Sequence, residues 1–234
     1  MADFEVKNLS LAWDNGQKVV EHASLEVSYG ETIALVGRSG TGKTTILHGL
    51  AGLIKPLEGQ VFLEGEDISG QAGKISYMFQ KDLLIPSKKI IDNVVLPLRL
   101  KGRSKEQAYQ QARDLFEIFG LAGTEQLWPH ELSGGMRQRA ACMRTYLMGN
   151  RTILLDEPFS ALDAFNKDDL HTWYKDVSKK FALASILVTH DVAEAVALAS
   201  RIYVLKGNPA KGEVSRIAAE LIAPTASELK AALS

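Results

Sequence analysis

The stretch GRSGTGKTT, from Gly37 to Thr45, constrains the fold more than any other part of the sequence. It contains the pattern G-x-x-x-x-G-K-[S/T], whose fixed positions are Gly37, Gly42, Lys43 and Thr44. Glycines at this spacing let a loop wrap so that successive backbone N–H groups point at one phosphate. The lysine can then reach the terminal phosphate oxygens, and the threonine hydroxyl can ligate Mg²⁺. The sequence therefore predicts a phosphate-binding loop.

The flanks of this loop match the topology that a phosphate-binding loop requires. Residues 32–36 are a compact apolar run, as expected of a buried strand that leads into the loop. After the loop, Ile46, Leu47, Leu50 and Leu53 recur at helical spacing and predict a helix with one inward face. The alternative, a glycine-rich turn with a solvated lysine, does not account for this context. We therefore expect strand, loop and helix in succession.

Strand and helix patterns alternate along most of the chain. Alternating apolar and polar residues predict the N-terminal strands, and the sequence DNGQK supplies the turn between the first two. Strands that alternate with helices imply a largely parallel sheet covered on both sides. The segments with these patterns are 4–11, 23–27, 59–63, 74–79, 152–155, 164–180, 185–188, 191–199 and 201–205.

Two further segments have helical patterns. The first runs from about 88 to 150, and Ser104 and Gln107 stand in it at the spacing of a capping box. The second is the C-terminal tail, which we expect to form one or two short helices, with Thr225 and Glu228 as another capping box.

These patterns together predict an α/β protein with a mostly parallel sheet, an N-terminal antiparallel β subdomain and an inserted α-helical subdomain. We expect one domain over 1–214, with the helical subdomain inserted over about 84–150. The helical tail over 215–234 is too short to form a separate domain.

The composition excludes several classes of protein. With 46% hydrophobic and 24% charged residues, the chain has the balance of a soluble globular protein. A formal net charge of -1 provides no basic field for nucleic acid or anionic lipid. The single cysteine, Cys142, excludes an internal disulfide, fits a reducing compartment and is expected to be buried. The opening residues lack a signal-peptide pattern, and no window has the roughly twenty apolar residues of a membrane span.

Two adjacent carboxylates follow another apolar strand, in the sequence TILLDEPFSALD. Asp156 stands at the predicted strand end, where it can hold Mg²⁺ through water near Thr44. Glu157 follows directly and is placed to orient or deprotonate an attacking water. Paired acids at a strand end can also form a surface turn, but a phosphate-binding loop in the same chain favours the site.

The sequence ELSGGMRQR, residues 131–139, places two glycines at the start of a helical stretch. Free N–H groups and the positive end of the helix dipole coincide at such a position, which makes it suited to an anion. This stretch alone leaves open which anion binds there.

In this order and spacing, the phosphate-binding loop, ELSGGMRQR, ILLDEPFSALD and ILVTHD resemble the ATP-binding cassette (ABC) ATPases. The resemblance covers about residues 4–206, and LSGG is its most specific element. It implies a P-loop NTPase core of the RecA type that binds ATP and Mg²⁺. It also implies a site built in halves, because the signature of one subunit closes over the nucleotide held by the other in a head-to-tail dimer.

The resemblance implies roles for individual residues. Glu157 and His190 would be catalytic, with His190 as the switch histidine that hydrogen-bonds the γ-phosphate. The metal-binding residues would be Thr44, Gln80 and Asp156. The nucleotide-binding residues would be Trp13, Gly37, Arg38, Ser39, Gly40, Thr41, Gly42, Lys43, Thr44, Thr45, Gln80, Ser133, Gly134, Gly135 and Asp163.

Some of these roles have structural alternatives. Trp13 would stack on adenine, but it could simply be an edge-strand aromatic. Asp163 matches a loop that signals between opposed sites, and Gln80 one that senses the transmembrane partner. The remaining histidines lack motif support and are interpreted as structural: His22, His48, His130 and His171.

Within the family, the sequence is most similar to the nitrate, sulfonate and taurine importers. Ser87 departs from this group, which often has tryptophan after the proline. The resemblance implies a peripheral subunit on the cytoplasmic face of the membrane. Its partners would be a second ATPase subunit, a transmembrane permease and, through the permease, an extracytoplasmic solute-binding protein.

Two other functions are considered. An ABC ATPase can drive a non-transport task such as lipoprotein extraction or cell-division signalling, and co-purification with a multi-span permease would argue against this. A small-molecule kinase would need an acceptor pocket and an arginine-bearing lid, and neither is visible in the sequence. If the importer assignment is correct, the sequence LLIP, residues 83–86, is expected to be exposed and to contact the permease.

Overall fold

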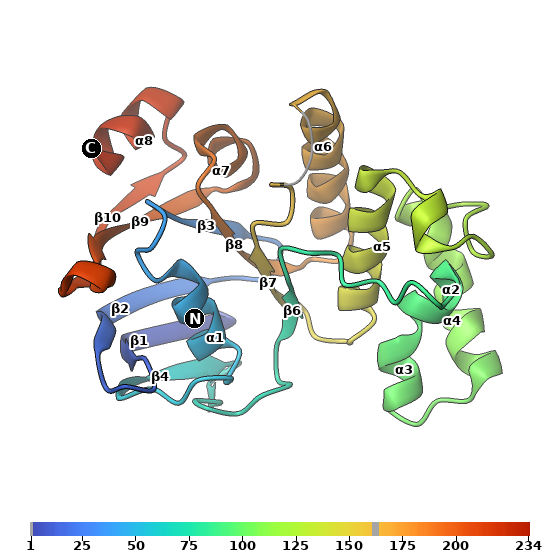
Figure 1. Ribbon diagram of the computed structural model, residues 1–234, viewed down its shortest axis with the longest axis horizontal. Coiled ribbons are helices and arrows are strands. Elements are labelled where there is room, and N and C mark those ends of the chain that lie inside the picture. Colours follow the sequence, from blue (N-terminus) through green and yellow to red (C-terminus); the bar gives the residue numbers. More distant parts are fainter. Residues whose placement is uncertain (1, 161–163) are drawn as a thin grey trace.

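The computed structural model describes residues 2–160 and 164–234 (Figure 1). Over these residues, one ten-stranded sheet has the order β5-β4-β1-β2-β10-β9-β3-β8-β7-β6. The strands are β1 (Phe4–Ala12), β2 (Lys18–Val27), β3 (Thr32–Gly37), β4 (Glu58–Leu63), β5 (Glu66–Asp67), β6 (Ser76–Met78), β7 (Thr152–Asp156), β8 (Ala184–Thr189), β9 (Arg201–Asn208) and β10 (Glu213–Ile222). The helices are α1 (Lys43–Leu50), α2 (Ile90–Val94), α3 (Leu96–Leu100), α4 (Lys105–Ile118), α5 (Gly134–Tyr146), α6 (Ala164–Lys180), α7 (Val192–Leu198) and α8 (Ala226–Leu233), with short 3-10 turns η1 (Pro129–Glu131) and η2 (Pro209–Lys211).

The half of the sheet that carries the phosphate-binding loop is parallel. Strand β3 pairs in parallel with β8 and β9, β8 with β7, and β7 with β6. Strands β1, β2 and β4 pair antiparallel at the other end. The predicted α/β fold, with its antiparallel N-terminal sheet, is therefore confirmed.

Strand β3 separates two apolar cores. Ile33 and Leu35 pack with α1 and the N-terminal strands, whereas Ala34 and Val36 pack with the helices on the opposite face. Alternate residues of a strand point to opposite faces, so an entirely apolar strand indicates that both faces are covered. The phosphate-binding loop at the end of β3 is thus held from both sides.

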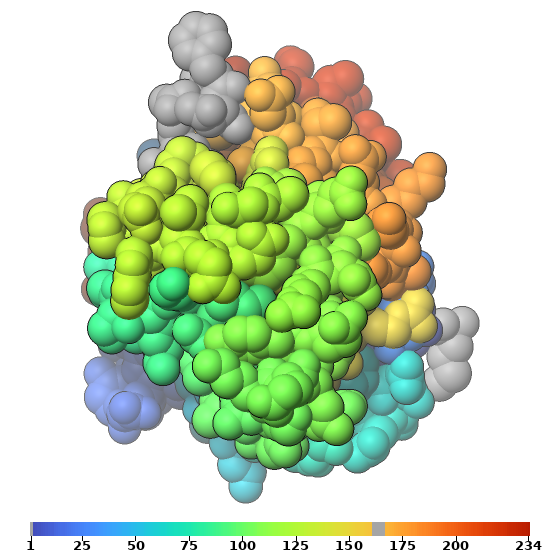
Figure 2. Space-filling model, turned by 90° about the vertical axis from the view of Figure 1, so that its right-hand side faces the viewer, coloured from blue at the N-terminus to red at the C-terminus, as the bar shows by residue number. Residues whose placement is uncertain are grey.

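The inserted helices α2–α5 form a separate layer beside the sheet, on the right of Figure 1. Seen from that side, their residues cover most of the surface (Figure 2). The Ser104 hydroxyl accepts from the backbone N–H of Gln107, and the Gln107 side chain accepts from the N–H of Ser104. The predicted capping box is therefore confirmed.

The sequence predicted that Leu53 belongs to the inward face of α1, and this prediction is wrong. Helix α1 ends at Leu50, and Gly52 adopts φ +71°. A Cβ atom at Gly52 would lie 2.5 Å from the backbone of Gln71, so the chain can turn there only with glycine. Leu53 follows this turn and is 55% exposed.

The predicted helix at the start of the C-terminal tail is wrong, because residues 213–222 form strand β10. This strand pairs antiparallel with β9 from Glu213 to Ile222 and contacts β2 through Ser215. Alanine, glutamate and leucine in this stretch favour a helix, but the edge of β9 supplies backbone partners that outweigh local propensity. The helix α8 then begins after Thr225, whose capping box is confirmed.

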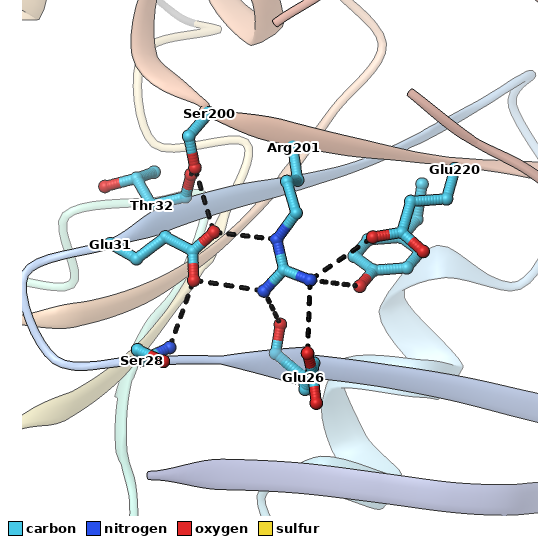
Figure 3. Close-up of polar contacts among 8 residues, drawn as sticks. Glu26, Ser28, Glu31, Thr32, Ser200, Arg201 and Glu220 are labelled. Atoms are coloured by element: carbon cyan, nitrogen blue, oxygen red, sulfur yellow. Dashed lines mark hydrogen bonds and ion pairs between the residues drawn. The ribbon is translucent and has the colours of Figure 1, made fainter. Parts of the chain in front are cut away.

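Arg201 connects three parts of the sheet (Figure 3). Its guanidinium donates to both carboxylate oxygens of Glu31, at 2.8 and 3.0 Å. It also donates to the backbone oxygen of Glu26, at 2.8 Å, and to the side chain of Glu220, at 3.2 Å. Glu31 in turn accepts from the Ser200 hydroxyl at 2.9 Å. Strands β2, β9 and β10 and the segment before β3 are thus tied together.

None of the helices in the described ranges is long and apolar enough to cross a membrane.

Candidate functional site

The phosphate-binding loop lies between β3 and α1, as predicted. Gly42 adopts φ +87° as the residue that precedes the helix, and a Cβ there would lie 2.7 Å from a methyl group of Val19. A Cβ at Gly37 would lie 2.7 Å from the backbone oxygen of Leu205. Both glycines are therefore required by close packing, and Gly42 also by its backbone angle.

Lys43 folds back over the loop that precedes it. Its ammonium donates to the backbone oxygens of Gly37 at 2.9 Å and Arg38 at 3.2 Å, and the residue is only 7% exposed. Burial lowers the pKa of Lys43, while the carboxylates of Glu157 and Asp156 oppose this shift. The Lys43 ammonium is therefore placed to bind an anion held on the concave side of the loop.

Asp156 ends strand β7 and is 9% exposed. The Tyr77 hydroxyl donates to its Oδ2 at 3.0 Å. Burial raises the pKa of Asp156, the hydrogen bond from Tyr77 opposes this rise, and the neighbouring Glu157 carboxylate adds to it. The Thr44 hydroxyl, as a hydrogen-bond donor, also lowers the pKa of this carboxylate. The structure therefore places Asp156 and Thr44 together, as the sequence predicted.

Glu157 has a left-handed backbone, with φ +45°. Its N–H donates to the backbone oxygen of Val188 at 2.9 Å, and its own backbone oxygen accepts from the Ser160 hydroxyl at 2.9 Å. The carboxylate then meets Gln80 Nε2 at 3.3 Å through one oxygen and His190 Nδ1 at 3.0 Å through the other. Residues other than glycine seldom adopt this backbone conformation, and those that do are concentrated at functional sites.

The topology explains why these side chains meet. Strands β3, β8, β7 and β6 are neighbours and parallel, so their carboxyl ends lie at one edge of the sheet. Lys43 follows β3, His190 follows β8, Asp156 and Glu157 lie at the end of β7, and Gln80 follows β6. Residues separated by more than a hundred positions in the sequence thereby form one cluster.

The signature segment lies apart from this cluster. The Ser133 hydroxyl accepts from the Met136 N–H at 3.3 Å as the N-cap of α5, and Ser133 is exposed. Among the described residues, no hydrogen bond joins Ser133, Gly134 or Gly135 to the phosphate-binding loop. The structure thus contains both halves of the predicted site but does not bring them together within one chain.

The other predicted nucleotide-binding residues lie in the phosphate-binding loop, in the β1–β2 turn or outside the described residues. Trp13 lies in the β1–β2 turn, where its N–H donates to Gln17, and is 38% exposed. Asp163 lies outside the described residues. Thr41 is buried, Thr45 is half-buried, and the exposed members of the loop are Arg38, Ser39, Gly40 and Thr44.

Sequence reasoning missed Tyr77 and Ser160. Tyr77 pairs with Leu154 in the β6–β7 register, and this position brings its hydroxyl to Asp156. Ser160 accepts from Gln80 Nε2 at 3.3 Å. Tyr77 falls within the predicted strand at 74–79, but only the pairing register identifies its partner.

An apolar groove of about 550 Å³ lies between β6 and the helical layer. Leu83, Leu100 and Phe79 line it and are exposed, at 52%, 80% and 43%. The expectation that the whole LLIP segment is exposed is wrong for Leu84, which is 6% exposed in the core of the helical layer. Leu83 has φ +46°, so the chain turns between the two leucines and only the first faces outward.

Comparison with known proteins identifies related sequences and structures. A sequence profile of the ABC transporter family, described as "ABC transporter", matches residues 20–160. The formylaminopyrimidine import ATP-binding protein ThiZ of Halalkalibacterium halodurans is 39% identical over 206 residues, which cover 88% of this chain and 80% of that protein. The taurine import ATP-binding protein TauB of Sinorhizobium fredii is 41% identical over 217 residues, covering 92% and 79%.

Among solved structures, the dimeric structure of the bacterial ABC transporter cassette MJ0796 has a TM-score of 0.77. It is 27% identical to this chain, and the alignment covers 95% of this chain and 99% of that one. A second dimeric structure of MJ0796, in a post-hydrolysis state bound to ADP and phosphate, matches equally well.

Proposed function

Because this chain belongs to the ABC transporter family, we propose that it is the ATP-hydrolysing subunit of an importer, acting as a dimer on a separate transmembrane permease. The observation that carries the proposal is the cluster at the carboxyl edge of the sheet, where Lys43, Asp156, Glu157, His190 and Gln80 converge. The relatives named as import ATP-binding proteins support the direction of transport.

ATP hydrolysis needs positive groups around the phosphates and a positioned water. We assign the first task to Lys43 and the N–H groups of the phosphate-binding loop. Glu157 orients the water, and its two hydrogen-bonded neighbours Gln80 and His190 hold the carboxylate in place. In the nucleotide-bound state, His190 exchanges this contact for the γ-phosphate.

The residues of this site also fit Mg²⁺. The ion prefers oxygen ligands and binds through few protein groups plus phosphates and water. Asp156 and Thr44 supply a carboxylate and a hydroxyl at the loop, and Gln80 supplies an amide oxygen beside Glu157. A bound Mg²⁺ would neutralise charge on the phosphates.

A second copy of the chain completes the site. Ser133 is exposed and, with the two glycines that follow it, stands at the start of the thirteen-residue helix α5, where no hydrogen bond among the described residues joins it to the loop of its own chain. In a head-to-tail dimer they close over the phosphates bound by the partner. The match to the dimeric MJ0796 structure supports this arrangement.

The apolar groove is the contact with the permease in this proposal. Its exposed leucines Leu83 and Leu100 fit a short apolar helix of the membrane subunit, and closure of the dimer moves the helical layer that forms one wall. The chain is then peripheral to the membrane, on its cytoplasmic face. An extracytoplasmic solute-binding protein would deliver the cargo to the permease.

The experiment that tests the proposal is the substitution Glu157→Gln. This variant is expected to bind ATP and to accumulate as a dimer, while the turnover number falls by at least a hundredfold. Light scattering with and without Mg·ATP measures the dimer, and phosphate release measures turnover. Glu58→Gln, at the exposed start of β4, serves as the control and is expected to match the wild type. Undiminished turnover in Glu157→Gln would refute the proposed role.

A further inference from the structure

Two polar pairs join helices α6 and α7 behind the site. Lys167 Nζ lies 2.8 Å from Asp191 Oδ2, and His171 Nε2 lies 3.8 Å from Glu194 Oε1. Lys167 and His171 are four residues apart on α6, while Asp191 and Glu194 are three apart at the start of α7. Residues at these spacings lie on the same face of a helix, so the two pairs bridge the facing sides of α6 and α7 about one helical turn apart.

The His171–Glu194 pair is buried, and its two facing atoms lie just beyond hydrogen-bond distance. His171 is 6% exposed and Glu194 is 2% exposed, and among the residues that the structure describes neither His171 Nε2 nor Glu194 Oε1 has a hydrogen-bond partner. A separation of 3.8 Å is too long for a hydrogen bond. Because most buried polar atoms are paired, two unpaired atoms that face each other need an explanation.

Both members of this pair are linked to segments that carry residues of the site. Helix α7 begins two residues after His190, and Asp191 caps it by accepting from the N–H groups of Ala193 and Glu194. On the other side, the ring of His171 contacts Phe159, with centroids 5.5 Å apart, and Phe159 follows Glu157 by two residues. The His171–Glu194 pair therefore spans the distance between the segments that carry Glu157 and His190.

We propose that His171 and Glu194 are positioning residues for hydrolysis: the bond between them is open in this structure and closes when Glu157 and His190 take their reactive arrangement around ATP. The shift needed is less than 1 Å, since a hydrogen bond forms at about 3 Å. The proposal rests on the ATPase function proposed above. It assigns a role to two groups that touch neither nucleotide nor metal.

The test compares His171→Phe, Glu194→Met and the double variant, whose apolar side chains can form no such hydrogen bond, in ATPase assays of the full chain. If the bond forms only in the reactive arrangement, each single variant that loses it has a kcat about tenfold lower, with KM for ATP nearly unchanged. The double variant falls no further than the more impaired single variant, because both changes remove one interaction. Ser178→Ala, which truncates another buried polar side chain of α6, is the control and keeps the wild-type kcat.

The alternatives give different results. A merely structural pair lowers the melting temperature of the variants while leaving kcat at the wild-type value, and independent effects multiply in the double variant; either result overturns the proposal. Should one of these variants fail to fold, His171→Leu and Glu194→Leu give the same comparison. Loss of the ATPase function itself is recognised separately, because the wild-type chain would then lack Mg·ATP turnover.

Discussion

Arg201 offers the strongest test of how this fold is held together. Replacing it with glutamine removes the guanidinium that joins β9 to Glu31, to the end of β2 and to β10 (Figure 3). The side chains of Arg201 and Glu31 are only 18% and 20% exposed, so water does not readily replace the lost contacts. Glu31 would retain a mostly buried carboxylate, and its remaining donors among the described residues would be Ser200 and the Ser28 N–H.

The expected loss of stability lies between two limits. Breaking a fully buried ion pair costs about 3–5 kcal/mol, whereas exposed pairs contribute about 0–1 kcal/mol. With four-fifths of each side chain buried and a bidentate geometry, we expect about 3 kcal/mol for Arg201→Gln. For a chain of this size, that loss lowers the melting temperature by roughly 6–12 °C.

The loss should also depend on pH. Burial alone would raise the pKa of Glu31, but hydrogen bonds from Arg201, the Ser28 N–H and Ser200 lower it below its ordinary value of 4.5. A carboxylate with a lowered pKa stabilises the fold above its unfolded pKa, and this stabilisation disappears as the pH falls through the lowered value. The difference between wild type and Arg201→Gln is therefore complete at pH 7 and decreases below pH 4.5.

Urea unfolding followed by circular dichroism at pH 7 and at pH 4 measures both effects. Arg216→Gln is the matched control, since Arg216 pairs with Glu21 on neighbouring strands but its side chain is 68% exposed. This control should lose less than about 1 kcal/mol. If Arg201→Gln and Arg216→Gln have equal stability, or if the loss at pH 4 exceeds that at pH 7, the reasoning about Arg201 is wrong.

Two further predictions concern the site. Leu83→Glu should abolish transport in reconstituted complexes, while it keeps soluble ATPase activity and changes the free energy of unfolding by less than about 0.5 kcal/mol. Leu84→Ala should instead lower the free energy of unfolding by about 2–4 kcal/mol, because it leaves a cavity at a buried position. Unimpaired transport in Leu83→Glu would count against the groove as the contact with the permease. Gly42→Ala should abolish ATP binding in titration calorimetry, because the added Cβ would lie 2.7 Å from a methyl group of Val19. Gly30→Ala is the control, since Gly30 also has a positive φ, +83°, but has open space around the Cβ position. This control should retain ATP binding and lose about 1–2 kcal/mol of stability. Tight ATP binding by Gly42→Ala would show that the loop can relax around the added methyl group.

The parts of the fold that sequence could predict are those determined by neighbouring residues. The phosphate-binding loop, its strand and its helix are contiguous, and the capping boxes at Ser104 and Thr225 involve residues three apart. Strand β10 was missed because its partners in β9 and β2 are provided by the tertiary structure. Leu53 and Leu84 were misplaced for a similar reason, since one glycine turn and one left-handed leucine reverse which side chains face outward.

The same distinction applies within the site, where Glu157 is identified by its sequence but positioned by long-range contacts. A left-handed backbone at a non-glycine residue costs on the order of 1–2 kcal/mol. Here the N–H is held by Val188 of the neighbouring strand, and the carbonyl by Ser160. This geometry places the carboxylate between Gln80 and His190, as the role proposed for Glu157 in hydrolysis requires. The candidate site is therefore a property of four adjacent strand ends rather than of any one motif.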